Sequence, residues 1–452
     1  MTFRAELRAM IRLAVPIVAV QLGQMLMGVV DTVMVGHVSP EAIAAVALGN
    51  LYFFGAAIFG MGALMALDPI VAQAVGAGDT VAVARGVQRG LILALGLSVV
   101  ATALLLPARP ILGWLRQPAG VADVAATYAR VEIAGILPFY LFGALRQSLQ
   151  ALKRIAPIVG AMVVGNLANV GLNYLWIYGH WGFPAAGAVG SAWATAVSRW
   201  VMLAWLLVVA WRSLRPQLLP LRREALAWAP LSRMAALGAP IGVQYELEYG
   251  VFAVVGLMMG WMGTAQLAGH QVALNLASLA FMVPLGVSGA AAVLVGHAVG
   301  AGDVAEARRA AAAGLVCGVG FMSASALVML LVPTFLARIY TTDAGVVALA
   351  ASLIPIAGVF QVFDGIQVVS IGILRGSGDT RAPMIINVLG FWLVGLPVSA
   401  ALGFRAGGGP RGLWWGLTVG LVFVALVLIW RVRRRLAGEV TRVAIDRDVA
   451  PA

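Results

Sequence analysis

The sequence predicts an all-α polytopic membrane protein with twelve transmembrane helices arranged in two six-helix lobes. Composition is the first observation: 62% of the 452 residues are hydrophobic, only 11% are charged, and the mean hydropathy is +0.97. Soluble domains are less apolar and carry about twice that charge. The second is the length of the apolar runs, which suits helices that cross a bilayer and exceeds what barrel strands need. The third is an internal repeat that relates the two halves of the chain.

The apolar runs divide the chain into two lobes of equal helix number. The N-terminal lobe is expected at 1–211, a basic cytoplasmic linker at 212–231, the C-terminal lobe at 232–431 and a cytoplasmic tail at 432–452. The first run continues past signal-peptide length, so it predicts a transmembrane helix. The expected spans are 13–37, 44–74, 88–106, 121–145, 156–178, 186–211, 232–260, 267–298, 309–333, 346–374, 383–402 and 411–430.

Basic residues gather on one side of these spans. With a cytoplasmic N-terminus, 23 Lys and Arg residues fall inside and 5 outside, while Arg130 and Arg199 lie within spans. The positive-inside rule therefore predicts that both termini are cytoplasmic. This topology explains the net charge of +12 without a nucleic-acid partner, and the basic tail is expected to contact anionic lipid.

Two motifs recur at one offset. VAQAVGAGD at 71–79 returns as VGHAVGAGD at 295–303, and LAVPI at 13–17 returns as LGAPI at 237–241. Each half has an even number of spans, so the repeats are parallel and related by an axis along the membrane normal. The doubled GAGD lacks the phosphate-loop pattern and predicts a turn. A binding cavity is expected between the lobes.

Three predicted spans carry carboxylates within their apolar runs: Asp31, Glu248 and Asp364. A charge at bilayer depth costs several kcal/mol, so such residues usually mark an ion or substrate path. None of the three is matched by an acid in the other half of the repeat, which favours function over shared packing. Glu246 points to another face of its helix than Glu248, and Arg199 is either a counter-ion or a residue that reaches the interface.

Polar side chains form stripes at helical spacing. Two interpretations stay open for the amides: they line a wet cleft, or they join helices through hydrogen bonds worth about 0.6 to 2 kcal/mol each. The stripes are Gln21, Gln24 and Asp31; Asn166, Asn169 and Asn173; Gln271, Asn275 and Ser278; and Gln361, Asp364 and Gln367. The single Cys317 predicts packing only, and no hydrolase or zinc motif is present.

Several of these segments together resemble the MATE (multidrug and toxic compound extrusion) transporters of the NorM-like bacterial branch. The resemblance covers nearly the whole chain and rests on QLGQMLMGVVDTVMVGH, the paired VGAGD loops, LNYLWIYG, YGVFAVVG with AGHQVALN, and FDGIQVVSIGILRGSGDTRAPM. It implies a multi-pass protein of the bacterial inner membrane. Its two lobes would alternate their access and export lipophilic, mostly cationic drugs in exchange for inward Na⁺ or H⁺.

The resemblance also implies roles for individual residues. Asp31 matches a protonation or cation residue, and Asn169 and Asn173 match polar positions beside it. Glu248 and Asp364 match a second cation site, the one expected to hold Na⁺ if sodium is the coupling ion. Gln271 matches a position that faces the drug, and Phe281 stands where relatives carry an aromatic residue over the cation site. With Asn275, Gln24 and Gln361 from the polar stripes, these are the expected substrate contacts.

The predicted mechanism is antiport by competition between the coupling ion and the drug at these carboxylates. No other cofactor, no enzymatic activity and a monomeric state are expected. The principal alternative is a flippase for lipid-linked saccharides or other lipids. An intramembrane hydrolase, which would cleave bonds in detergent without any gradient, and a channel, which would show gradient-independent current, also rank well below the antiporter.

Overall fold

The computed structural model describes residues 2–114 and 119–446, and these residues form helices and connecting turns without a strand. Arg116 and Arg447, counted above among the outside and inside charges, lie outside the described residues. In chain order the elements are α1 (Phe3–Gly36), α2 (Pro40–Leu64), α3 (Leu67–Gly76), α4 (Thr80–Leu105), α5 (Ala108–Trp114), α6 (Ala119–Ala151), α7 (Ala156–Tyr178), α8 (Gly187–Val209), α9 (Trp211–Leu218), η1 (Arg223–Leu226), α10 (Trp228–Met262), α11 (Thr264–Gly300), α12 (Val304–Leu331), α13 (Pro333–Arg338), α14 (Ala344–Gly376), α15 (Arg381–Asn387), η2 (Val388–Gly395), α16 (Leu396–Ala400), η3 (Ala401–Arg405) and α17 (Gly409–Ala437).

The long helices confirm the predicted fold class. In the described part of the chain, eleven helical runs are long and apolar enough to cross a membrane, with α2 and α3 forming one run and α15 to η3 another. The further long helix is α10, which has 35 residues. It stays outside that group because Glu246 and Glu248 interrupt its apolar sequence, so the helix with the weakest apolar signal carries the predicted ion site.

The repeated GAGD segments are turns that end one helix and begin the next. Gly78 and Gly302 adopt left-handed backbone conformations, with φ of 70° and 75°, which glycine enters without steric cost. The aspartate that follows each glycine then caps a helix: Asp79 accepts a hydrogen bond from the Ala82 N–H, and Asp303 accepts one from the Glu306 N–H. The motif recurs because each half needs the same turn.

The helices divide into two compact units. One unit, here the C-terminal unit, comprises residues 1–18, 76–78 and 243–443; the other, the N-terminal unit, comprises 19–75, 79–242 and 444–452, of which 444–446 are described. Helices α1 and α10 each contribute to both units. The lobe boundaries predicted from the sequence stay a prediction.

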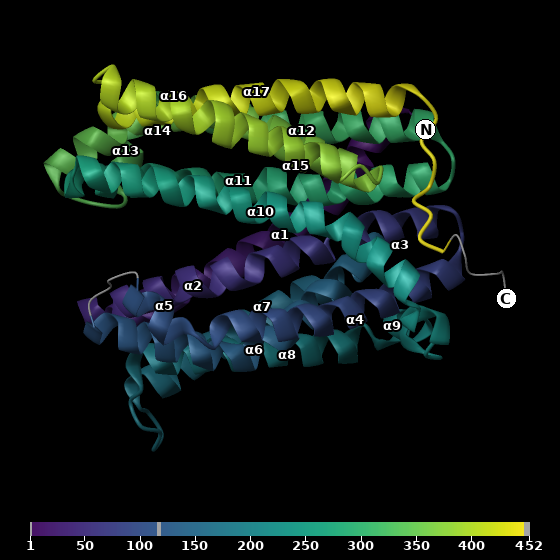
Figure 1. Cartoon of the computed structure of the whole chain (residues 1–452), viewed down its shortest axis with the longest axis horizontal. Coiled ribbons are helices and arrows are strands. Elements are labelled where there is room, and N and C mark those ends of the chain that lie inside the picture. Colours follow the sequence, from purple (N-terminus) through teal and green to yellow (C-terminus); the bar gives the residue numbers. More distant parts are fainter. Residues whose placement is uncertain (1, 115–118, 447–452) are drawn as a thin grey trace. The chain divides into compact units, whose positions relative to one another are not determined.

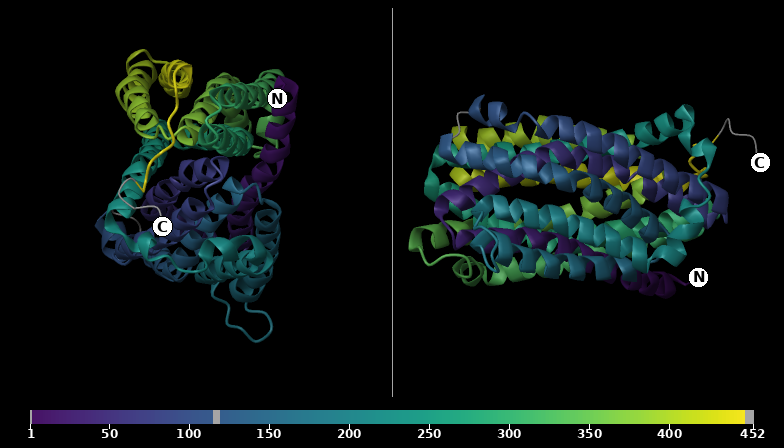
Figure 2. Two further views of the ribbon diagram at one scale, coloured as in Figure 1. Left: turned by 90° about the vertical axis from the view of Figure 1, so that its right-hand side faces the viewer. Right: turned by 90° about the horizontal axis from the view of Figure 1, so that it is seen from below.

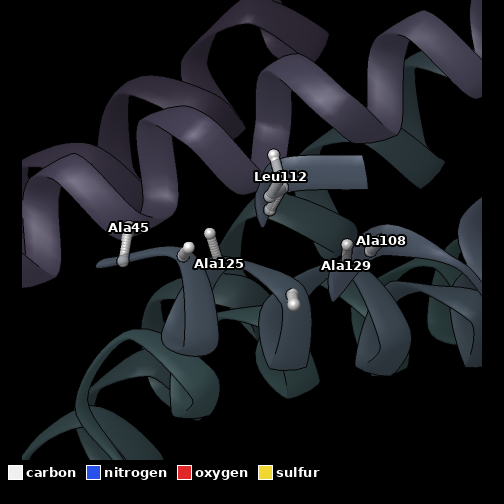
Figure 3. Close-up of a cluster of buried hydrophobic side chains, with 7 residues drawn as sticks. Ala45, Ala108, Leu112, Ala125 and Ala129 are labelled. Carbon is white, nitrogen blue, oxygen red and sulfur yellow. The ribbon is translucent and has the colours of Figure 1, made fainter. Parts of the chain in front are cut away.

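Small residues hold the N-terminal unit together. Helices α2, α4, α6, α7 and α8 pack around one another in it (Figure 1). One of its cores consists almost entirely of alanine, with Leu112 of α5 reaching into it (Figure 3): Ala45, Ala108, Leu112, Ala122, Ala125, Ala126 and Ala129. With mostly alanine between them the helix backbones approach closely, as is usual where lipid gives no hydrophobic drive for association.

The C-terminal unit is built around α14, which packs against α11, α12 and α17. The green to yellow helices of this unit run lengthwise in Figure 1 and are seen nearly end-on in the left view of Figure 2. The approach of α14 to α11 requires glycine, because a Cβ at Gly372 would lie 2.3 Å from the Ser288 carbonyl oxygen. This contact fixes the helix that carries Asp364.

Candidate functional site

Asp31 lies in a closed pocket of hydrogen-bond donors within the N-terminal unit. Its side chain is 3% exposed, and its Oδ1 accepts hydrogen bonds from the amides of Asn169 (3.0 Å) and Asn173 (2.7 Å). The two asparagines are one turn apart on α7 and fully buried. The structure therefore brings together the first-helix acid and the α7 amides that the sequence indicated.

Thr195 of α8 completes this pocket, and sequence reasoning missed it. Its hydroxyl donates to Asp31 Oδ2 at 2.6 Å and accepts from the Asn169 amide at 3.2 Å. A single threonine in an apolar helix gives no sequence signal, since threonine often bonds its own backbone there. The pocket is thus built from α1, α7 and α8.

A buried ion pair lies close enough to Asp31 for its charges to interact with it. Arg199 of α8 donates to Glu132 of α6, whose side chain is fully buried. The guanidinium also lies 4.4 Å from the ring centre of Phe53 and 5.1 Å from that of Phe139, an arrangement that stabilises a desolvated cation. Of the two interpretations of Arg199, the counter-ion is correct, and its partner is Glu132.

Glu248 of α10 and Asp364 of α14 form a carboxylate pair in the C-terminal unit. Their charges interact, and both side chains are half-buried, unlike that of Asp31. Glu248 Oε1 accepts a hydrogen bond from the Gln367 amide at 3.3 Å, and Gln244 contributes a second one. The structure thus brings together the two acids that the sequence placed on distant spans.

Two aromatic rings, those of Phe360 and Phe252, meet one helical turn from this pair. Phe360 lies one turn before Asp364 on α14, and its ring meets that of Phe252 edge-on with ring centres 6.3 Å apart; Phe252 lies one turn after Glu248. Phe281 is half-buried on α11, and neither carboxylate is linked to it by a described contact. A register argument along α14 could have found Phe360, because positions four apart share a helix face.

Two of the glutamines expected to contact substrate make protein contacts. Gln361 is fully buried; its amide nitrogen donates to the Ala277 carbonyl and its oxygen accepts from Ser325. Gln24 accepts a hydrogen bond from Arg146 of α6 at 2.8 Å. These contacts support the helix-joining interpretation at both positions. Arg146, one of the residues counted above on the cytoplasmic side, lies within α6 and is 5% exposed.

Gln271 and Asn275 remain available for ligand contacts. Both side chains are exposed, and they lie one turn apart on α11. Glu246 is half-buried on α10, separate from the Glu248 contacts described above. Across the described residues, no three His, Cys, Asp or Glu side chains gather as a metal cluster would require. Glu248 and Asp364 place two carboxylates beside the amides of Gln244 and Gln367.

Comparisons with known proteins agree over nearly the full chain. The MatE family model matches residues 16–175 and 240–401. The chain is 37% identical over 438 residues to the probable multidrug resistance protein NorM of Rhizobium meliloti (strain 1021), covering 95% of this chain and 93% of the relative. It is 39% identical to the multidrug resistance protein PmpM of Pseudomonas aeruginosa, covering 95% of this chain and 92% of that protein.

Solved structures share the fold at lower identity. The eukaryotic MATE transporter AtDTX14 superposes with a TM-score of 0.87 at 21% identity, over 96% of this chain and 99% of that one. A MOP superfamily transporter from Pyrococcus furiosus, whose description proposes a different function from the reverse polarity of its binding pocket, gives a TM-score of 0.84 at 21% identity over 96% of each chain. The shared fold does not identify the transported substrate, so the class of substrate has to be argued from the charge of the site.

Proposed function

The chain belongs to the MatE family, and from that premise we propose that it is a multidrug efflux antiporter, which exports lipophilic organic cations in exchange for inward Na⁺ or H⁺. The observation that carries this proposal is the half-buried pair of Glu248 and Asp364, held on two helices with their charges in reach of each other. Two neighbouring acids attract a cation strongly, and they repel each other once it leaves. The relatives described above are named as multidrug resistance proteins.

The exchange follows from competition for the same negative charge. A proton or Na⁺ arriving from outside neutralises the carboxylate pair and removes the attraction that holds a cationic drug. The drug then leaves, and loss of the coupling ion towards the cytoplasm restores the site for the next molecule. Alternation between inward and outward access requires that each ligand binds the two states with different affinity; occupancy of Glu248 and Asp364 supplies that difference.

Asp31 is proposed as a second coupling site with a different chemistry. Three donors surround its carboxylate, and the buried Asn173 Oδ1 accepts no hydrogen bond from any described residue. A carboxylate, two amide oxygens and a hydroxyl are oxygen ligands of the kind that hard cations prefer. Protonation of Asp31, or Na⁺ binding among these oxygens, would change the hydrogen bonds that Asn169, Asn173 and Thr195 make. Occupancy of the site would thereby alter the contacts of α7 and α8.

A flippase for lipid-linked saccharides is the second candidate, and the structure gives it less support. Its anionic diphosphate cargo would need a cationic partner within the membrane, and Arg199, the arginine nearest the centre of the N-terminal unit's spans, is neutralised by Glu132. The acids at Glu248 and Asp364 favour a cationic cargo instead. We further propose a monomer in the bacterial inner membrane with both termini in the cytoplasm.

The test is efflux of a fluorescent organic cation from proteoliposomes containing the purified full chain, with a Na⁺ gradient and a pH gradient imposed separately. Efflux under one gradient identifies the coupling ion. Asp364→Asn should reduce coupled efflux at least tenfold, whereas Asp343→Asn, at the exposed N-cap of the same helix, is the matched control and should leave it intact. Scrambling of a labelled lipid without dye efflux would instead favour the flippase.

A further inference from the structure

The segment that joins α8 to α10 carries an unusual surface. Apolar side chains project outward along it: Trp211 is 43% exposed, Leu221 80% and Trp228 77%. Arginines alternate with them at 212, 215, 222 and 223. Exposed patches that combine large apolar groups with basic residues mark a binding surface or a membrane contact.

A groove runs along the outer face of α9 within this surface. Six residues line it, and its volume is about 780 Å³: Trp211, Arg212, Arg215, Pro216, Leu219 and Pro220. The opposite face of α9 is anchored, because Leu214 is fully buried and the helix packs on α4 and α8. Helix α9 therefore presents an aromatic ring and two guanidinium groups to its surroundings from a fixed base.

The wall of the groove is held by hydrogen bonds from α4. The Gln88 amide donates to the carbonyl oxygens of Gln217 and Pro220, both at 3.1 Å, and its own oxygen accepts from the Arg222 N–H at 2.9 Å. Arg89 donates to the Glu224 carbonyl at 3.0 Å. These partners are nearly buried on α4, so the groove is formed before any ligand arrives, which lowers the entropy cost of binding.

The charge of the groove is uncompensated. The acid of this segment, Glu224, pairs with Arg85 of α4 at 3.5 Å. Arg212 and Arg215 are exposed, and neither forms an ion pair within residues 2–114 and 119–446. The groove thus joins two free guanidinium groups to an indole ring, and it lacks a carboxylate of its own.

We propose that this groove binds the headgroup of an anionic phospholipid of the surrounding bilayer. Helix α8 ends at Val209 and α9 begins at Trp211, so the groove lies at the level where a span leaves the membrane. Guanidinium groups bind phosphate oxygens in a bidentate manner, and tryptophan favours the headgroup region. The lipid phosphate would pair with Arg212 and Arg215, while Trp211 and Leu219 contact the glycerol and the first acyl carbons.

Native mass spectrometry of the full chain in detergent, titrated with phosphatidylglycerol or phosphatidylcholine, tests this proposal without any transport assay. Wild-type protein should retain phosphatidylglycerol in preference to phosphatidylcholine. Arg212→Gln with Arg215→Gln should weaken phosphatidylglycerol binding about 30-fold, since each basic residue near a membrane surface contributes a factor of roughly five. Arg212→Lys with Arg215→Lys should recover part of it.

The matched control is Arg405→Gln with Arg411→Gln, which removes the same charge from two exposed positions outside the groove. Undiminished lipid binding in this control, with an unchanged melting temperature in both double variants, completes the expected result. Equal retention of both lipids, or equal losses in the two double variants, would overturn the proposal. A concentration-dependent dimer abolished by Trp211→Ser would assign the groove to a second copy and overturn it as well.

Discussion

The two carboxylate sites differ in how completely the protein satisfies them. Asp31 is 3% exposed and accepts hydrogen bonds from Asn169, Asn173 and Thr195. Glu248 and Asp364 are half-buried, and of the two amides that donate to Glu248, those of Gln367 and Gln244, the first lies at a long 3.3 Å. The first site encloses its acid with donors, whereas the two acids of the second keep part of their surface exposed.

This difference indicates that the two sites have different roles in the protein. A buried carboxylate with three donors is costly to disturb, because each displaced donor loses a partner away from water. A partly exposed pair with fewer donors can exchange ions with less rearrangement. We therefore expect changes at the Asp31 site to affect stability as well as transport, and changes at the carboxylate pair to affect transport alone.

The largest loss of stability is expected beside Asp31, at the Glu132–Arg199 pair. Arg199→Met leaves Glu132 fully buried without its counter-ion, which typically costs about 3 to 5 kcal/mol. The double variant Glu132→Leu with Arg199→Met removes both charges and should recover most of that loss. Thermal unfolding in a single detergent measures both variants. Equal losses in the single and double variants would show that packing, rather than charge, holds this part of α6 and α8.

The next largest loss of stability is expected for Asp31→Asn. The carboxylate accepts three hydrogen bonds, two of them from amides, whereas an asparagine side chain has one oxygen and turns its own donor towards this pocket. At least one buried donor then loses its acceptor, at a cost of about 1 to 3 kcal/mol. The melting temperature should fall clearly below that of Asp364→Asn. If the two variants unfolded together, the contrast between the closed and the open site would be wrong.

Thr195→Val sharpens the comparison by removing a single donor with little change in volume. We expect a loss of about 1 kcal/mol, since one hydrogen bond to Asp31 disappears while the rest of the pocket remains. Thr195→Ser keeps the hydroxyl and serves as the control. Thr195→Val removes the hydroxyl, whereas Thr195→Ser removes the methyl group. Chemical unfolding of both variants therefore separates the contribution of the hydrogen bond from that of packing. If Thr195→Val unfolded at the same denaturant concentration as wild type, the hydrogen bond from the Thr195 hydroxyl to Asp31 would contribute nothing to stability.

The smallest effect on stability is expected from Glu248→Gln. The glutamine keeps an oxygen that can accept from Gln367, and the site is half-open, so the change should stay within about 0.5 kcal/mol. Coupled efflux should nevertheless be lost. The informative result is therefore a folded, inactive protein, and a variant that melts well below wild type would show that the pair has a structural role.

Sequence reasoning recovered the fold because a bilayer allows few solutions. The span expected at 156–178 coincides with α7 (Ala156–Tyr178), and the expected 232–260 lies within α10 (Trp228–Met262). The short helices α5, α9 and α13 were missed, because fewer than nine residues give too little periodic signal. The apolar pattern thus located the spans, and the elements at their ends required the structure.

The candidate sites show where such reasoning ends. Asp31, Glu248 and Asp364 were identified because ionisable residues within apolar runs are rare. Their neighbours were harder to find: helical periodicity tells which residues share a face and leaves open which helix that face meets. Thr195 and Phe360 therefore escaped notice, and the choice between a snorkelling and a paired Arg199 required the position of Glu132 in the structure.

The most direct test of the account is the ion flux that a cationic substrate induces. Proteoliposomes holding wild type, Asp364→Asn or Asp343→Asn would be given substrate on one side, while Na⁺ movement is followed with a radioactive tracer and proton movement with an enclosed pH indicator. We predict that one ion moves against the substrate in wild type and Asp343→Asn, and that Asp364→Asn abolishes this flux while its melting temperature stays near that of wild type. Undiminished substrate-induced flux in Asp364→Asn would contradict the assignment of the carboxylate pair as the coupling site.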